Sequence, residues 1–272
     1  MLAQRLVVAA VGLPLLALLL LAPERWFSAA TTLVIAAGTA EFVLASPGAM
    51  SRTTALAAAV AAAMIAATVR AIPGAQSWSL IALLGTTALM LALLLYIRDE
   101  DRVDEGGSPP GLWWLGGVLY LGALGAHWLL LRALPDGAWW MFVLLATVFA
   151  TDTAAYTTGK LIGRHRLWPA VSPNKTWEGF VGGMLLGGAT VVGLPLALGI
   201  ASPALSPWLA LLAVGVPLLA IGGDILESAL KRRMGVKDMS NLLPGHGGLL
   251  DRLDSLLAAG PLLYWIVQWT TP

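Results

Sequence analysis

The sequence predicts an all-α integral membrane protein, a polytopic bundle of about nine transmembrane helices with a cytoplasmic N-terminus. Of the 272 residues, 58% are hydrophobic and only 11% are charged, whereas soluble domains carry about 25% charged residues. The apolar residues occur in runs near the roughly 20 residues that a helix needs to cross a bilayer. Positive charges gather in alternate connections between these runs, which is the pattern of a chain that crosses a membrane repeatedly.

Breaks at proline, glycine and charge divide the chain into nine expected spans. Helices are expected because lipid offers backbone groups no hydrogen-bond partners, and abundant Leu and Ala with little alternation argue against a β-barrel. The first span follows Arg5 and has the alternative of a signal peptide, but no convincing cleavage site lies near Ala22, so a retained helix is expected. The spans cover residues 6–22, 26–45, 53–71, 78–97, 112–132, 138–159, 178–200, 206–230 and 252–270.

The distribution of lysine and arginine predicts the orientation. With the N-terminus in the cytoplasm, thirteen of these residues lie on the cytoplasmic side and three on the opposite side, which satisfies the positive-inside rule. The cytoplasmic set is Arg5, Arg52, Arg98, Arg102, Lys160, Arg164, Arg166, Lys175, Lys231, Arg232, Arg233, Lys237 and Arg252, and the opposite set is Arg25, Arg70 and Arg132.

The two halves of the chain differ in character. Residues 1–135 form plain apolar spans, and we expect them to be a scaffold and a candidate for dimer contacts. Residues 136–272 place polar side chains at or inside the spans, and we expect a catalytic region with cytoplasmic loops 160–177 and 231–251. Two polar residues in other spans, Glu41 and His127, receive no role. The small residues Gly182, Gly183, Gly187 and Gly188 predict close helix packing within one span.

The first polar cluster places Asp152 in an otherwise apolar helix. An acidic side chain in a span costs about 2.5–3.5 kcal/mol on insertion scales, so it should face a polar cavity, a cation or a partner. Tyr156 follows at i+4 and shares its face. We expect Asp152 to bind a cation or to orient Lys175, and the alternative is a polar pair that packs two helices together.

The second cluster is the segment Ser172–Gly179, with the sequence SPNKTWEG. Ser172-Pro173 indicates a turn, and an Asn or Thr before an apolar run is typical of a helix cap. A helix N-terminus beside a lysine can bind an anion, so Ser172, Asn174, Lys175 and Thr176 are candidate phosphate-binding residues. The alternative is an interfacial loop with a tryptophan anchor.

The third cluster pairs acidic residues at two span ends. Asp224 and Glu227 lie at i, i+3, as do Asp251 and Asp254, so each pair shares a helix face. Carboxylates with substrate phosphates are the ligands that Mg²⁺ prefers, and cationic side chains hold the remaining phosphate charge. These four acids are the candidate metal ligands. The basic loop between them adds Ser228, Lys231, Arg232, Lys237, Asp238, His246, Gly247, Gly248 and Arg252 as candidate catalytic or substrate-binding residues.

Several classes of site are excluded or less favoured. The chain has no Cys, no His pair at metal spacing and no GxxxxGK[ST] motif, which argues against thiol chemistry, a zinc site and a P-loop. The net charge of +1 names no partner, and no nucleic acid is expected. A basic patch on anionic lipid is the alternative for the third cluster, but it does not explain paired acids at span ends.

The third cluster also carries a family resemblance. Ser228, Lys231-Arg232, Lys237-Asp238 and the run LPGHGGLLDRLD at 243–254 resemble the signature of the phosphatidate cytidylyltransferase (CDP-diacylglycerol synthase) family. Residues 172–179 and the segment with Asp152, Tyr156, Gly159 and Gly163 are similar to it as well. The resemblance covers residues 150–255 strongly, and the first half only as a set of hydrophobic spans.

The resemblance implies a reaction of CTP with phosphatidate that yields CDP-diacylglycerol and pyrophosphate. It further implies dependence on Mg²⁺ with room for a second cation, a homodimer, and a bacterial inner membrane with the active site facing the cytoplasm. Two alternatives stay open. A CTP-dependent polyprenol or dolichol kinase would release CDP, and a transporter would place its acids nearer the midplane on broken helices.

Overall fold

The computed structural model describes residues 2–47, 50–72, 74, 85–86, 110–243 and 247–271. Six apolar helical segments in these ranges are long enough to cross a membrane: α2, α3, α5, α6, α7 and Pro203–Met234, which combines the 3₁₀ turn η2 (Pro203–Trp208) with α8. The chain is therefore an integral, polytopic membrane protein, as its sequence predicts. The eight α-helices of the described ranges are α1 (Leu2–Leu21), α2 (Glu24–Ala45), α3 (Arg52–Ala71), α5 (Pro110–Ala133), α6 (Gly137–Ile162), α7 (Trp177–Ala197), α8 (Leu209–Met234) and α9 (Asp254–Thr270).

Eight of the nine predicted spans coincide with these helices to within a few residues at each end. The remaining span, 78–97, lies outside the described residues. Local signals set several of the boundaries. Helix α2 begins directly after Pro23, and α3 begins after Ser51, whose hydroxyl accepts a hydrogen bond from the Thr54 N–H at 3.1 Å. A serine in this position satisfies a backbone donor that the first helical turn leaves without an intrahelical acceptor.

The chain is helical as predicted, and the loop 160–177 additionally contains a short antiparallel hairpin. Strands β1 (Arg166–Trp168) and β2 (Ser172–Thr176) pair Arg166 with Thr176 and Trp168 with Ser172, with an irregularity between the two pairs. Strands of three and five residues are too short to show an alternating pattern in the sequence. Pro173 is compatible with β2 because both strands of a two-stranded sheet are edges.

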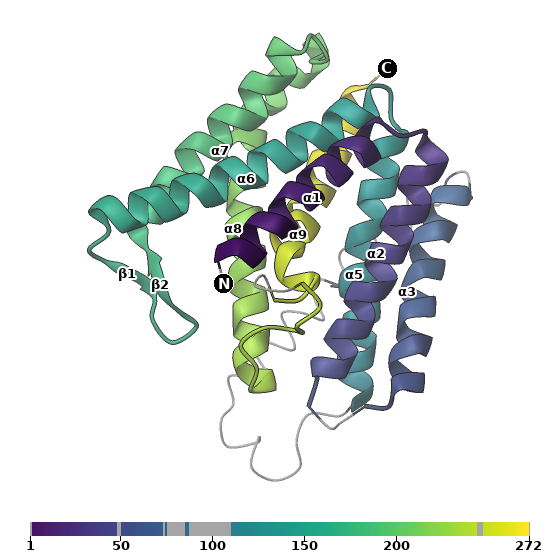
Figure 1. The fold of residues 1–272 in the computed structure, drawn as a ribbon. Coiled ribbons are helices and arrows are strands. Elements are labelled where there is room, and N and C mark those ends of the chain that lie inside the picture. Colours follow the sequence, from purple (N-terminus) through teal and green to yellow (C-terminus); the bar gives the residue numbers. More distant parts are fainter. Residues whose placement is uncertain are drawn as a thin grey trace. The chain divides into compact units, whose positions relative to one another are not determined.

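One compact unit comprises Met1–Leu130 and Leu230–Leu253. Helices α2, α3 and α5 lie side by side in it (Figure 1). The Phe42 ring lies 6.0 Å from the Trp113 ring and 6.3 Å from the Tyr120 ring, between centroids. Small residues let α3 and α5 approach closely, since a Cβ on Gly122 would lie 3.0 Å from the Ala62 Cα. Close contact of small residues is a common way for helices to associate within lipid.

The other compact unit comprises Leu131–Ala229 and Asp254–Pro272. Helix α6 packs along α7, and the hairpin lies at the end they share (Figure 1). A Cβ on Gly183 would lie 3.0 Å from the Thr151 carbonyl oxygen of α6, and one on Gly188 would lie 2.6 Å from the Ala213 carbonyl oxygen of α8. The predicted role of the α7 glycines in close packing is thus confirmed. The functional division at residue 135 stays a prediction.

Replacing Gly188 with Ala should destabilise the protein. The added methyl would press on the backbone of α8, and such overpacking costs about 1–3 kcal/mol. Gly193→Ala on the same helix is the matched control, because a Cβ there meets nothing within 4 Å and Ala is the better helix former. Thermal unfolding in detergent should show a lower midpoint for Gly188→Ala alone. Equal midpoints for the two variants would contradict the close α7–α8 contact.

Candidate active site

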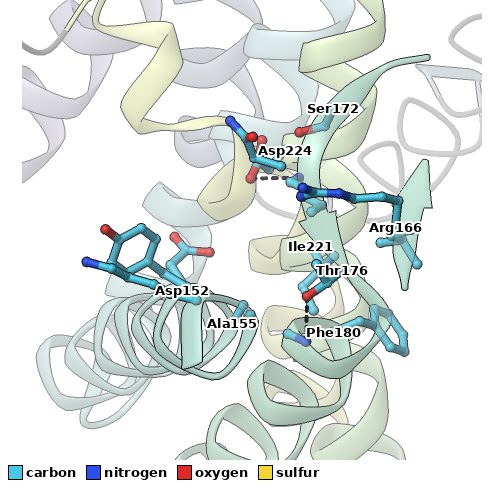
Figure 2. Close-up of a pocket in the computed structure, with 15 residues that line it drawn as sticks. Asp152, Ala155, Arg166, Ser172, Thr176, Phe180, Ile221 and Asp224 are labelled. Carbon is cyan, nitrogen blue, oxygen red and sulfur yellow. Dashed lines mark hydrogen bonds and ion pairs between the residues drawn. The ribbon is translucent and has the colours of Figure 1, made fainter. Parts of the chain in front are cut away.

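A cleft of about 650 Å³ opens among α6, the hairpin, the start of α7 and α8 (Figure 2). Its volume lies within the range of small-molecule binding sites, roughly 300–1,000 Å³. Seven residues that the sequence nominates line it together: Asp152, Tyr156, Ser172, Asn174, Lys175, Thr176 and Asp224. Lys160 and Arg166 also line the cleft, although the sequence did not identify them as candidate site residues. The hairpin that carries Arg166 toward the cleft leaves no signal in the sequence.

Charge of both signs lines this cleft. Lys175 forms an ion pair with Asp224, with Nζ and Oδ2 2.8 Å apart, and their side chains are 23% and 37% exposed. Asp224 also accepts a long hydrogen bond of 3.4 Å from the Ser228 hydroxyl, one turn further along α8. Three cations and two carboxylates in one partly enclosed space can hold a polyanion, with the carboxylates available to a cation that accompanies it.

The N-terminus of α7 is built as the sequence predicts. Thr176 is the N-cap residue, and its hydroxyl accepts a hydrogen bond from the Gly179 N–H at 3.1 Å. Gly159 and Gly163, which belong to the segment that resembles the family, leave room for this cap. A Cβ on Gly159 or on Gly163 would lie 2.9 Å from the Thr176 hydroxyl oxygen. The cap therefore fixes where β2 ends, and with it the position of the adjacent Lys175.

Glu178 anchors the other end of the hairpin. Its carboxylate accepts hydrogen bonds from the backbone N–H groups of Arg164 and His165, at 3.1 and 3.3 Å. The same carboxylate contacts the His165 ring nitrogen Nδ1 at 2.7 Å. The turn between α6 and β1 is thus attached to the first turn of α7, which limits the freedom of the strand that bears Arg166.

A second charged pair lies in the unit that contains residues 230–253. Lys231 contacts Asp251 with Nζ and Oδ1 2.7 Å apart, and the two side chains are 14% and 3% exposed. The other oxygen of Asp251 accepts hydrogen bonds from the N–H groups of Met239 and Gly248, at 3.1 and 2.7 Å. Asp251 lies in the short 3₁₀ turn η3 (Leu250–Arg252). Met239 and Gly248 therefore both lie against this carboxylate.

Gly247 is needed at its position in this loop. Its φ is +85°, a conformation that residues with a side chain rarely adopt. A Cβ there would also lie 2.8 Å from an oxygen of Asp251. The sequence nominated Gly247 and Gly248 for close backbone approach, and the structure places both next to Asp251.

The remaining nominated residues have varied surroundings. Arg232, Lys237, Asp238 and Arg252 are exposed, and His246 lies outside the described residues. Glu227 is buried at 1% exposure, and Asp254 at 7% accepts a hydrogen bond from the Ser255 N–H at 2.7 Å. Among the described residues, no three His, Asp or Glu side chains are arranged to hold a metal ion by themselves. The role of Asp224, Glu227, Asp251 and Asp254 as metal ligands stays a prediction.

The side chains of the cleft fit Mg²⁺ if phosphates supply further ligands. Asp152 and Asp224 line the same space, together with the Ser172 hydroxyl and the Asn174 amide. Mg²⁺ is commonly bound through one or two carboxylates while substrate phosphates and water complete its shell. The donor set is thus of the right chemical kind.

Sequence reasoning missed one buried acid that contacts the Asp251 loop. Glu41 of α2 is 8% exposed and accepts hydrogen bonds from the Ser240 hydroxyl and from the Leu249 and Leu250 N–H groups. A carboxylate in an apolar span is itself a signal of function. The sequence could mark the residue, but it gave no indication of the partner, which lies about 200 positions later in the chain.

Comparison with known proteins assigns the chain to a family. Residues 3–270 match the cytidylyltransferase family. The phosphatidate cytidylyltransferase of Bacillus subtilis is 41% identical over 66% of this chain and 64% of its own length. Proteins of the same name from Mycobacterium bovis and Staphylococcus haemolyticus are 42% and 45% identical, over 50% and 47% of this chain and 44% and 48% of their own lengths.

The matched region is thus less than two thirds of the length of each of these relatives. The family match, in contrast, extends over nearly the whole chain, including the apolar first half and both charged pairs. On this match, the chain belongs to the cytidylyltransferase family.

Proposed function

We propose that this protein is a phosphatidate cytidylyltransferase, which converts CTP and phosphatidate to CDP-diacylglycerol and pyrophosphate. The observation that carries the proposal is the family match over residues 3–270, taken together with relatives that are named phosphatidate cytidylyltransferase. The cleft supports it, because a chain with six candidate spans brings Lys160, Arg166 and Lys175 together with two carboxylates. A lipid phosphate and a nucleotide triphosphate both need such cationic surroundings.

The proposed reaction needs no activated protein nucleophile. A phosphate oxygen of phosphatidate attacks the α-phosphorus of CTP, a P–O bond forms to the lipid phosphate, and the bond to the β-phosphate breaks as pyrophosphate leaves. Both reactants are anions, so the protein must bring them together and stabilise the negative charge that builds on the leaving group. Lys175 and Arg166 are assigned to the phosphate oxygens in the cleft. Lys231 and Asp251 are assigned to the same reaction from the sequence signature.

The cation would be held by Asp152 and Asp224. Bound there, Mg²⁺ would supply charge neutralisation for the phosphates. In the structure, Asp224 pairs with Lys175 at 2.8 Å. Lys175 therefore serves two purposes in the proposal, since it holds the carboxylate in place and offers its charge to an incoming phosphate.

We also propose nine spans with the N-terminus in the cytoplasm. Contacts within each unit support this topology, because helix ends expected on the same side of the membrane meet. On the cytoplasmic side, Lys175 meets Asp224, and the end of α2 meets the loop 239–251 through Glu41. On the opposite side, Arg70 at the end of α3 pairs with Glu24 at the start of α2, with Nε and Oε1 2.9 Å apart.

The proposed site therefore faces the cytoplasm, where CTP is available, and phosphatidate reaches it from the lipid. The named relatives are bacterial, which supports an inner-membrane location. The homodimer stays a prediction that mass measurement in detergent would test.

Pyrophosphate release tests the proposed function. The protein, purified in mild detergent with Mg²⁺, should release pyrophosphate only when CTP and phosphatidate are both present. EDTA should abolish the release, and excess Mg²⁺ should restore it, because the phosphates need a counter-cation in the transition state. Diacylglycerol in place of phosphatidate is the matched control, since it lacks the attacking phosphate. Absence of release under conditions in which the Bacillus subtilis relative is active would overturn the proposal.

A further inference from the structure

Glu41 makes three hydrogen bonds to a single distant segment of its own unit. The Ser240 hydroxyl and the Leu249 N–H donate to Oε1, at 2.6 and 3.0 Å. The Leu250 N–H donates to Oε2, at 2.9 Å. Both carboxylate oxygens are thus used, and all the donors belong to the loop 239–251. Glu41 therefore ties this loop to a helix that crosses the membrane.

The backbone groups that Glu41 binds are the ones that start the turn carrying Asp251. Leu249 is the residue before η3, and Leu250 is its first residue. Buried N–H groups at the start of such a turn need an acceptor, and here the acceptor comes from α2. The Ser240 hydroxyl, which donates to Glu41, also accepts a hydrogen bond from the Leu242 N–H at 3.1 Å. Glu41 is thus linked to the backbone of Leu242 as well.

Gly248 lies close to the carboxylates of both Glu41 and Asp251. Its N–H donates to Asp251 at 2.7 Å. A Cβ on Gly248 would lie 3.0 Å from Oε2 of Glu41 and 3.1 Å from Oδ2 of Asp251. Both carboxylates therefore lie against the Gly248 backbone. A change in the position of Glu41 moves the backbone that fixes Asp251.

We propose that Glu41 is a positioning residue for Asp251, and through Asp251 for Lys231, in the reaction of this protein. The inference rests on the proposed function for its kinetic consequence, but its structural part, the attachment of the loop 239–251 to α2, does not depend on any activity. Lys231 contacts Asp251 at 2.7 Å, and Asp251 also accepts hydrogen bonds from the Met239 and Gly248 N–H groups, which lie next to the residues that Glu41 binds. Residues that orient functional ligands, as outer-shell partners do around metal sites, typically contribute about 10- to 100-fold to affinity or activity.

The test compares Glu41→Gln with Thr39→Val. Gln keeps the size of the side chain but turns an NH₂ group toward backbone donors. Thr39 is also a buried polar residue on the same helix, and its hydroxyl donates to the Ile35 carbonyl of that helix, at 2.8 Å. Ser240→Ala is the milder second variant, which removes one donor and also covers the case that Glu41→Gln does not fold. For each protein, amide hydrogen exchange across 239–252 and the kcat and KM for CTP are measured in detergent.

We expect Glu41→Gln to speed exchange in 239–252 and to lower kcat about 10- to 100-fold while its melting temperature stays near that of the wild type. Ser240→Ala should shift both readouts in the same direction by less, and Thr39→Val should leave both unchanged. Unchanged exchange in Glu41→Gln overturns the inference, as does faster exchange with unchanged kcat. A wild type without turnover overturns the proposed function alone, because the exchange measurement still decides whether Glu41 holds the loop.

Discussion

Asp251→Asn should lower kcat about 100- to 1,000-fold, the usual loss when one charge-stabilising group is removed from an active site. Asp251 is 3% exposed, pairs with Lys231 and accepts two backbone N–H groups. Asn has the same shape but turns an NH₂ group toward donors and removes the negative charge that Lys231 contacts. Turnover is measured as pyrophosphate release, beside the thermal unfolding midpoint in the same detergent.

The double variant Asp251→Asn, Lys231→Met separates a catalytic role of this pair from a structural one. Breaking a buried ion pair by removing one partner costs about 3–5 kcal/mol, whereas removing both charges is often neutral. We therefore expect the double variant to regain the unfolding midpoint that Asp251→Asn loses, without regaining turnover. If activity returned together with stability, the pair would be structural, and its assignment to the reaction would be wrong.

Lys175→Met should lower kcat/KM for CTP about 100-fold. Lys175 is held at the cleft by its 2.8 Å contact with Asp224 and by the cap at the adjacent Thr176. A preorganised cation that faces phosphates contributes more than one in water, because the protein has already oriented it. Initial rates over a range of CTP concentrations give both kcat and KM.

Two further variants make this prediction specific. Arg164→Gln removes a nearby cation that does not line the cleft, and it should leave kcat/KM within about twofold of the wild type, as surface changes usually do. Asp224→Asn should instead raise the Mg²⁺ concentration needed for half-maximal rate. If Arg164→Gln were as damaging as Lys175→Met, the effect would reflect the net charge of the region and not the cleft.

The sequence predicted the helices well because their main determinant is local. A run of about 20 apolar residues ended by proline or charge can be read directly, and the expected span 26–45 differs from α2 (Glu24–Ala45) by two residues at one end. The cap at Thr176 and the close packing at Gly183 and Gly188 also follow from residue types at fixed spacing.

Contacts between distant segments could not be predicted in the same way. Lys175 and Asp224 were both candidate site residues, but their pairing was not predicted. Asp152 was expected to bind a cation or to orient Lys175, and the observed ion pair of Lys175 is with Asp224. The contact of Glu41 with Ser240 spans 199 positions, and no periodicity relates the two. The hairpin was not predicted because its strands are short and one of them contains Pro173. Residue types thus identified the chemistry of the site, whereas its pairings required the fold.

Double-labelled CTP tests the central claim most directly. The protein is given phosphatidate, Mg²⁺ and CTP with one label in the cytosine ring and a second on the γ-phosphate, and the lipid phase is then extracted. The proposed reaction sends the cytosine label into the lipid and the γ-label into pyrophosphate. A parallel reaction contains a polyprenol in place of phosphatidate. If the γ-label then entered the lipid and the cytosine label stayed in CDP, the protein would be a lipid kinase, which would contradict the proposed function. Neither label in lipid with either acceptor would contradict it as well.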